Sequence, residues 1–253
     1  MKIDILTIFP EMFDSVLSSS ILGRAREAGL LEVTCTDIRP FSTLKHKNTD
    51  DYPFGGGAGM VMLAQPIADA MQAVTGENFR GKRIYMGPRG KTLTTALARE
   101  LAKEEHLVLL CGHYEGVDQR ALDTCIDEDI SIGDYILTGG ELAAMVLTDC
   151  VARFIPGVLG SADSPEEESF SDGLLEYPQY TRPAEWNGMR VPEILLSGNH
   201  AKIREWRRAE SIRATYRHRP DLLQHAVLDK KDQKTLAALQ EEATEETICS
   251  CEN

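Results

Sequence analysis

Short apolar runs alternate with helix-like segments through the first half of the chain. The runs are rich in Ile, Leu and Val, and they cover residues 2–9 (KIDILTIF), 30–38 (LLEVTCTDI), 82–87 (KRIYMG) and 106–112 (HLVLLCG). Residues 94–105 (TTALARELAKEE) instead carry apolar side chains at helical spacing. Strands that alternate with helices predict an α/β fold with a mainly parallel sheet.

The pattern changes after residue 160. Residues 161–173 (SADSPEEESFSDG) are polar and acidic and lack periodicity, which is typical of a linker. Residues 200–216 then carry an apolar residue every three or four positions, which predicts a helix with an apolar stripe. The members of this stripe are Ile203, Trp206, Ala209, Ile212 and Tyr216. The stripe favours a core position for Trp206 over a base-stacking one. We expect a domain over residues 1–160, an acidic linker over 161–173, a small helical domain over 174–246 and a disordered tail over 247–253.

Length and composition narrow the class of protein. A chain of 253 residues with 42% apolar residues can bury one large core or two modest ones. Asp4 interrupts the first apolar run and no cleavage site follows it, and nothing approaches the roughly 18 apolar residues of a membrane span. We therefore expect a cytoplasmic protein with no membrane contact. The cysteine and histidine spacings match neither a metal site nor a disulfide framework, so we assign no metal ligands.

Charge is distributed unevenly along the chain. The formal net charge of −13 argues against a general nucleic-acid binder, because such proteins neutralise phosphates. Residues 200–220 (HAKIREWRRAESIRATYRHRP) nevertheless hold seven Lys or Arg and two Glu. This asymmetry predicts that one surface of the protein meets an anion.

Two glycine motifs are ambiguous when taken alone. Residues 84–92 (IYMGPRGKT) look like a P-loop, but a Walker A loop needs a glycine at the position of Tyr85, so a turn that opens a helix is simpler. Residues 54–60 (FGGGAGM) contain three successive glycines, which allow either close approach to a ligand or a flexible surface loop.

Two further motifs point to a ligand site. Residues 111–120 (CGHYEGVDQR) follow a strand, so Gly112, Tyr114 and Glu115 are expected in the crevice beyond the carboxyl ends of a parallel sheet. Residues 131–145 (SIGDYILTGGELAAM) hold three glycines, Asp134 and Glu141, but no Lys or Arg. A cradle without a cation does not suit a phosphate. The two acids could also be helix-capping or solvent-facing groups.

Together the motifs resemble a known family. IFPEMF, GGGAGM, CGHYEGVDQR, SIGDYILTGGE, RFIPGVLG, GLLEYPQYTRP and VPEILLSGNHAKIREWR occur in the order and spacing of bacterial tRNA (guanine-N1)-methyltransferases, over about residues 1–228. The resemblance implies methyl transfer from S-adenosylmethionine to N1 of guanosine 37 in tRNA, next to the anticodon. It also implies an obligate homodimer with active sites at the subunit interface and a SPOUT-type parallel sheet with a deep trefoil knot, an exception to the general absence of threaded loops.

The resemblance accounts for the missing cation. S-adenosylmethionine has a sulfonium cation and no phosphate, so an acidic, glycine-rich loop suits it. The cofactor residues that the resemblance implies are Tyr85, Met86, Gly87, Pro88, Gly112, Tyr114, Glu115, Ile132, Gly133, Asp134, Tyr135, Ile136, Leu137, Gly139 and Gly140. Some family members are assisted by Mg²⁺, and the acidic residues here would permit a weakly bound ion.

The reaction needs a base and a cation. Guanine N1 carries a proton at neutral pH, and negative charge develops on O6 as this proton leaves. Arg153 matches the family's catalytic arginine, with a structural salt bridge as the alternative. The family's base most often precedes SF in EDSF, whereas this chain reads EEESF, so Glu168 takes that position with Glu167 as the fallback. The acidic run could also be only a solvated linker.

The basic helix is the expected tRNA contact. Its phosphate-binding candidates are Lys202, Arg204, Arg207, Arg208 and Arg213. The pocket and residues 45–60 would select the guanosine, which must flip out of its stack. Three alternatives stay open: a P-loop-like nucleotide hydrolase, a catalytically silent RNA-binding protein, and a methyltransferase that acts on another RNA position.

Overall fold

The computed structural model describes residues 1–160 and 168–251, with side chains described up to residue 242. The chain divides into two compact units, Met1–Ala162 and Asp163–Asn253. We call them unit 1 and unit 2 and describe each by itself. Their boundary falls within the segment that we interpret as a linker, of which residues 161–167 lie outside the described residues.

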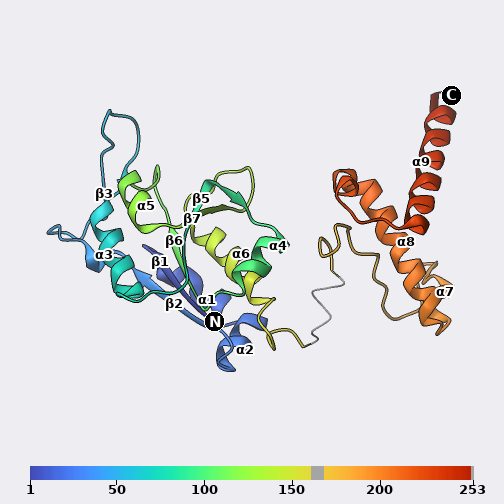
Figure 1. The fold of residues 1–253 in the computed structure, drawn as a ribbon, viewed down its shortest axis with the longest axis horizontal. Coiled ribbons are helices and arrows are strands. Elements are labelled where there is room, and N and C mark those ends of the chain that lie inside the picture. Colours follow the sequence, from blue (N-terminus) through green and yellow to red (C-terminus); the bar gives the residue numbers. More distant parts are fainter. Residues whose placement is uncertain (161–167, 252–253) are drawn as a thin grey trace. The chain divides into compact units, whose positions relative to one another are not determined.

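Unit 1 is built on a five-stranded sheet of order β2-β1-β6-β5-β7, drawn in Figure 1. Its strands are β1 (Lys2–Thr7), β2 (Glu32–Asp37), β5 (Lys82–Thr92), β6 (His106–Cys111) and β7 (Glu128–Ser131). Every neighbouring pair is parallel, which confirms the predicted α/β fold with a parallel sheet.

One segment differs from its prediction. The residues expected to form a turn that opens a helix, GPRGKT, belong to β5, whose register against β7 shifts between Met86 and Lys91. The next helix, α4, begins only at Thr95, after Thr94 caps it by accepting a hydrogen bond from the Leu97 N–H. The bulged strand extends one wall of the sheet beyond the end of β6.

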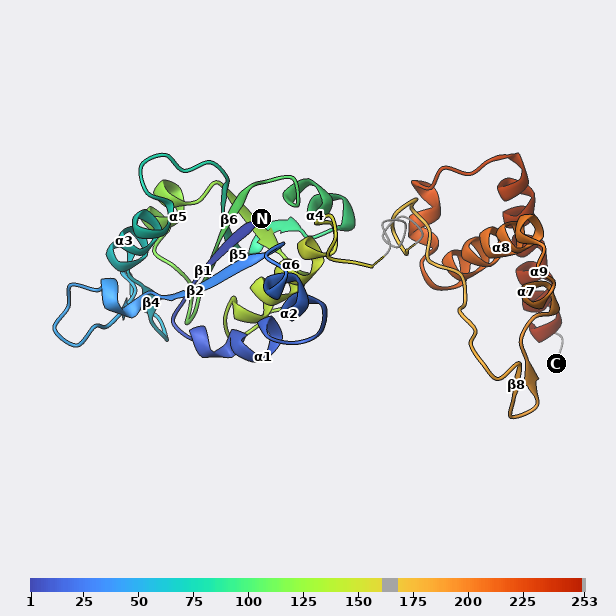
Figure 2. The same cartoon turned by 90° about the horizontal axis from the view of Figure 1, so that it is seen from below.

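Helices cover both faces of the sheet. Figure 2 shows α3 and α5 on one side of it and α1, α2 and α6 on the other. The helices of unit 1 are α1 (Asp14–Leu17), α2 (Ser20–Glu27), α3 (Ala64–Thr75), α4 (Thr95–Leu101), α5 (Gln119–Cys125) and α6 (Glu141–Ala152), with 3₁₀ turns at Pro10–Phe13 and Arg39–Phe41.

Strand β6 explains this layering. Leu107 and Leu109 pack into the core on the α4 and α6 side, whereas Val108 and Leu110 pack into the core on the α3 and α5 side. Alternate residues of a strand point to opposite faces, so a strand covered on both faces is apolar throughout. The run HLVLLC therefore marks a central strand.

The first apolar run contains a buried carboxylate. Asp4 is 2% exposed, and it lies 2.9 Å from Lys2 Nζ and 2.7 Å from His106 Nε2. A buried charge needs such partners. The acid that interrupts the run is therefore accommodated within the sheet, by side chains from β1 and β6.

The described residues of unit 2 form a hairpin and three helices. Its elements are β8 (Glu185–Trp186), β9 (Met189–Arg190), α7 (Glu193–Leu196), α8 (His200–His218), a 3₁₀ turn at Pro220–Gln224, and α9 (Lys230–Cys251). Leu174, Ile212 and Leu239 form its buried core. Helix α9 continues to Cys251, through residues that we expected to be a disordered tail. Within the described part of the chain, no helix is long and apolar enough to cross a membrane.

Candidate active site

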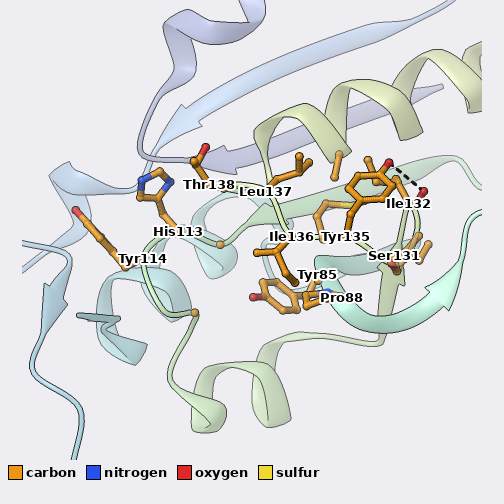
Figure 3. A pocket seen from close by; sticks show the side chains of 18 of the residues that line it. Tyr85, Pro88, His113, Tyr114, Ser131, Ile132, Tyr135, Ile136, Leu137 and Thr138 are labelled. Atoms are coloured by element: carbon orange, nitrogen blue, oxygen red, sulfur yellow. Dashed lines mark hydrogen bonds between the residues drawn. The ribbon is translucent and has the colours of Figure 1, made fainter. Parts of the chain in front are cut away.

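A pocket lies where the parallel strands β5, β6 and β7 end. Three loops contribute to its lining: residues 87–88 after the ladder between β5 and β6, residues 112–116 after β6, and residues 132–140 after β7 (Figure 3). The carboxyl ends of parallel strands meet at one edge of a sheet, where ligands of α/β proteins bind. This confirms the expectation that Gly112, Tyr114 and Glu115 lie in such a crevice.

Most residues of the predicted cofactor set gather in this pocket. All of them except Asp134 line it; Asp134 is exposed and is not among the lining residues. The structure adds lining residues that we did not predict, namely His113, Gly116, Ile130, Ser131, Thr138 and Ala143. Each of them lies within three residues of a predicted one. The sequence could have indicated them only through their position beside the predicted motifs.

Glycines let the pocket wall pack closely. A Cβ atom at Gly140 would lie 2.8 Å from Cys111 Cα, and one at Gly112 would lie 2.7 Å from the Tyr85 hydroxyl. Both distances are too short for real Cβ atoms. At Gly140 the obstacle is backbone, so a side chain there would force the wall to move, whereas at Gly112 the end of the Tyr85 side chain would have to shift. Burial raises the pKa of Tyr85, which keeps its phenol neutral against these glycines.

Hydrogen bonds join two of the pocket loops. The Gly140 N–H donates to the Gly112 carbonyl at 2.8 Å, and an isolated bridge pairs His113 with Gly139. Backbone contacts therefore connect the loop after β6 to the residues before α6, and the two segments form one continuous wall of the pocket.

The FGGGAGM loop lies next to the same site. The Glu115 N–H donates to the Met60 carbonyl at 3.0 Å, and a Cβ at Gly59 would meet the Glu115 side chain. Gly55, Gly56 and Gly57 have positive φ values but open space around them. Gly59 therefore packs closely against the Glu115 side chain, whereas the three successive glycines before it have open space.

Glu141 is a buried anchor behind the pocket. It is 2% exposed at the start of α6, and its Oε1 accepts a hydrogen bond from the Thr7 hydroxyl at 2.8 Å. Its Oε2 lies 4.0 Å from His113 Nδ1, a buried atom that has no hydrogen-bond partner among the described residues. A carboxylate here also complements the positive end of the α6 dipole. The solvent-facing alternative therefore holds for Asp134 and not for Glu141.

The pocket carries no strong cation. Among its described lining residues there is no Lys or Arg, and Glu115 is an acid. Much of the remaining surface is apolar or backbone. These residues fit a neutral or cationic ligand with an adenine-like edge, as a sulfonium nucleoside has, better than a phosphate.

The two predicted catalytic residues belong to different units. Arg153 is half-buried at the carboxyl end of α6, where its backbone N–H donates to the Asp149 carbonyl. Glu168 belongs to unit 2 and lines a second pocket there, together with Arg204, Arg207 and Arg208. Glu166 and Glu167 lie outside the described residues.

The basic helix α8 divides its cations between two roles. Lys202 and Arg204 are exposed, as a phosphate contact requires. Arg208 instead binds Asp172 and Asp232 and donates to the Val227 carbonyl, so it holds three segments of unit 2 together. The two other candidates also have contacts within unit 2: Arg213 pairs with Glu210, and Arg207 lies over the Tyr177 ring.

No group of three His, Cys, Asp or Glu side chains that could hold a metal ion occurs among the described residues. The weakly bound Mg²⁺ that we considered from the acidic composition gains no support from this geometry.

Comparison with known proteins decides the family. The family model for tRNA (Guanine-1)-methyltransferase TrmD matches residues 1–225. The chain belongs to this family. It is 59% identical over 223 residues to the tRNA (guanine-N(1)-)-methyltransferase of Ruminiclostridium cellulolyticum, covering 88% of this chain and 96% of that protein. It is 55% identical over 243 residues to the protein of the same name from Limosilactobacillus fermentum, covering 94% of this chain and 96% of that one.

A third relative matches to a similar extent. The tRNA (guanine-N(1)-)-methyltransferase of Bacillus cereus is 54% identical over 242 residues, which cover 95% of this chain and 99% of the relative. The resemblance drawn from the sequence motifs is therefore confirmed. A methyltransferase family implies S-adenosylmethionine as methyl donor.

Proposed function

We propose that this protein transfers a methyl group from S-adenosylmethionine to N1 of guanosine 37 of tRNA. The observation that carries the proposal is the glycine-walled pocket at the ends of β5, β6 and β7, which has no Lys or Arg among its described lining residues. In a tRNA (guanine-1)-methyltransferase, such a pocket suits the cationic methyl donor.

The loops of unit 1 would hold the donor. Backbone N–H and C=O groups of residues 132–140 would meet the adenine edge, and Ile136 and Leu137 would cover its apolar faces. Gly112 and Gly140 admit close approach because they lack side chains. When bound, S-adenosylmethionine supplies an electrophilic methyl group.

Glu168 and Arg153 would have separate roles in the reaction, one as a base and one as a hydrogen-bond donor to the developing charge. Glu168 would accept the N1 proton of guanine, while the Arg153 guanidinium would donate hydrogen bonds to O6, where negative charge develops. A glutamate has nearly the basicity of the aspartate usual in the family, but its additional methylene changes its reach. Because the two residues belong to different units, productive geometry depends on how the units come together.

The proposal includes a homodimer with the active site at the subunit interface. Leu142 and Val146 are exposed on α6, four positions apart and hence on one face of the helix, and Ile136 at the pocket rim is 80% exposed. Such an exposed apolar surface is typical of an association site, and it adjoins the pocket.

The proposal also includes the deep trefoil knot, the tRNA-binding role of unit 2 and a cytoplasmic location. Contacts between residues 139–140 and residues 112–113 support the knot, because they hold the segment before α6 against the loop after β6. Exposed Lys202 and Arg204 on α8 support the tRNA-binding role. The cytoplasmic location follows from the location of tRNA, the proposed substrate.

The test is transfer of labelled methyl from S-adenosylmethionine to unmodified tRNA transcripts. We expect label on transcripts with guanosine at position 37 and none on transcripts with adenosine there. Glu168→Gln should lower the rate by about 10²- to 10⁴-fold, and Arg153→Ala by about 10²- to 10³-fold. Lys103→Ala, a substitution of an exposed residue outside the pocket, is the control.

Each alternative outcome has a distinct meaning. Label on the adenosine-37 transcript would indicate a different RNA position. tRNA binding without label from the wild-type protein would indicate a catalytically silent RNA-binding protein. A nearly unchanged rate in Glu168→Gln would move the base to another residue, and Glu167→Gln would be measured next. ATP-dependent turnover without S-adenosylmethionine would revive the hydrolase alternative.

A further inference from the structure

Unit 2 contains a groove that the proposed methyl-transfer chemistry does not use. It lies between the extended segment of residues 177–184, helix α7 and the first half of α8. Three aromatic rings and three guanidinium groups line it: Tyr177, Tyr180, Trp206, Arg182, Arg204 and Arg207.

The charge of this groove is unlike that of the protein. The chain holds 40 acidic residues against 27 Lys and Arg, yet neither Asp nor Glu is among the described residues that line the groove. The neighbouring pocket beside Glu168 differs, since Asp172 and Glu176 line it as well. A purely positive groove in a strongly negative protein selects an anionic ligand.

The aromatic rings are available for contact. Tyr180 is 48% exposed, and its ring lies 6.3 Å from that of Trp206, with the ring planes inclined at 52°. Arg207 lies over the Tyr177 ring at 4.6 Å, and its buried Nε lacks a hydrogen-bond partner among the described residues. A ligand in this groove would meet a flat aromatic surface beside guanidinium groups.

The apolar stripe of α8 explains why the groove is open. Its second half, with Ile212 and Tyr216, packs into the core of unit 2. Its first half, with Ile203 and Trp206, lines the groove instead. Trp206 is therefore half-buried at a surface hollow, although the spacing of the stripe favoured a core position for it.

We propose that this groove binds one unstacked nucleotide of RNA, with the base stacked on Trp206 and Tyr180 and the phosphate paired with Arg204 or Arg182. Proteins bind single-stranded nucleotides by this combination of aromatic faces and cations. The inference rests on the proposed function, because it takes tRNA as the ligand. It adds a second place where the RNA leaves its helical stack, separate from the methyl-transfer pocket.

The two tryptophans of the chain allow a direct test. Trp186 lies in β8 and is 63% exposed, on a hairpin that stands away from α8 (Figure 2), and it does not line the groove. Trp186→Phe leaves Trp206 as the sole tryptophan, and Trp206→Phe leaves only Trp186. Each variant is titrated with an anticodon stem-loop RNA and with a blunt RNA duplex that carries the same number of phosphates.

We expect the stem-loop to quench Trp206 fluorescence and the duplex to leave it unchanged, because only the loop offers an unstacked base. The fluorescence of Trp186 should respond to neither RNA. Equal quenching of Trp206 by both RNAs, or quenching by neither, would overturn the proposal.

Kinetics supply the second measurement. Trp206→Leu should raise the KM for tRNA about ten- to hundredfold, whereas Trp206→Phe, which keeps a stacking face, should retain most of the affinity. The KM for S-adenosylmethionine should stay unchanged in both, because its proposed pocket is in unit 1. If Trp206→Leu does not fold by circular dichroism, Tyr180→Leu replaces it, since Tyr180 is half exposed.

The outcomes separate this inference from the proposed function. Wild-type methyl transfer with an unchanged KM for tRNA in the folded leucine variant would overturn the groove and leave the function standing. Absence of methyl transfer together with stem-loop quenching of Trp206 would overturn the proposed function and leave the groove as an RNA-binding site.

Discussion

Thr7 and Glu141 are 134 residues apart in the chain, yet the Thr7 hydroxyl donates a hydrogen bond to Glu141 Oε1 at 2.8 Å in the buried interior of unit 1. The bond joins the end of the first strand to the start of α6. Thr7 Oγ1 also accepts a hydrogen bond from the Phe9 N–H at 2.9 Å. One hydroxyl group therefore makes hydrogen bonds to two segments that lie behind the pocket, the residues just after β1 and the start of α6.

Thr7→Val should destabilise unit 1 by about 1–3 kcal/mol, because it keeps the side-chain shape but leaves a buried carboxylate oxygen and a backbone N–H without their partner. Hydrogen exchange of the β6 amides measures this loss in unit 1. Thr34→Val, an exposed position in β2, is the control and should change stability by less than about 0.5 kcal/mol. Equal protection in the two variants would contradict the prediction.

Gly140→Ala should weaken S-adenosylmethionine binding at least about tenfold, because the new Cβ would lie 2.8 Å from Cys111 Cα and would force the pocket wall to move. The backbone of Gly140 is in the helical region, so alanine is not excluded by its dihedral angles. Calorimetric titration with S-adenosylmethionine measures the effect. The matched control is Gly160→Ala, where nothing lies within 4 Å of the added atom. An unchanged Kd in the Gly140 variant would show that the wall adapts.

Arg208→Ala should destabilise unit 2 by roughly 2 kcal/mol, because it leaves the buried Asp232 carboxylate without its cation. The value is below that of a fully buried pair because the Arg208 side chain is 32% exposed. Both tryptophans lie in unit 2, so urea unfolding followed by tryptophan fluorescence reports on this unit.

Arg204→Ala is the companion variant. Arg204 is exposed, so its loss should change the urea midpoint little but should weaken tRNA binding. The opposite result, with Arg208→Ala fully stable and defective only in tRNA binding, would restore Arg208 to the role that its place in the basic run predicted.

Cys35 should react slowly in the folded protein. Burial raises the pKa of its thiol to about 11, with smaller contributions from charged neighbours. At pH 8 iodoacetamide should therefore alkylate Cys35 about a hundredfold more slowly than in urea-unfolded protein, because the thiolate fraction is that much lower. Peptide mass spectrometry of the modified site gives both rates.

The same pKa shift predicts a pH dependence of stability. Between pH 9 and pH 11 the folded state keeps the Cys35 proton while the unfolded state loses it, so stability falls as the pH rises through this window. Replacement by serine, Cys35→Ser, should remove this contribution. A stability that is flat over the window in the wild-type protein would contradict it.

Much of unit 1 was predictable because its central strands are apolar on both faces. Strand β7 was missed, since two of its four residues, Glu128 and Asp129, are acidic. It is an edge strand, and Glu128 Oε1 lies 2.6 Å from Lys91 Nζ on β5. The position at the sheet edge and this ion pair together accommodate the acidic side chain. Local composition identifies a strand only where both faces are covered.

The pocket at the ends of β5, β6 and β7 was predictable because two of its loops follow recognisable strands and because all three carry the family's motifs. The separate role of Arg208 was not, because its partners Asp172 and Asp232 lie 36 and 24 positions away and nothing in the basic run marks it out. The same limit applies to Trp206. A three-to-four repeat shows which residues share a helix face, but not which half of that face finds a packing partner.

The bond between the Gly140 N–H and the Gly112 carbonyl has a kinetic consequence. Because His113 is also paired to Gly139, two backbone contacts hold the inner wall together, and we expect it to move as one piece. Residues 135–138 are all exposed to solvent and form the outer rim. A ligand therefore enters and leaves past this rim, so substitutions there should change the speed of exchange more than the orientation of the ligand once inside.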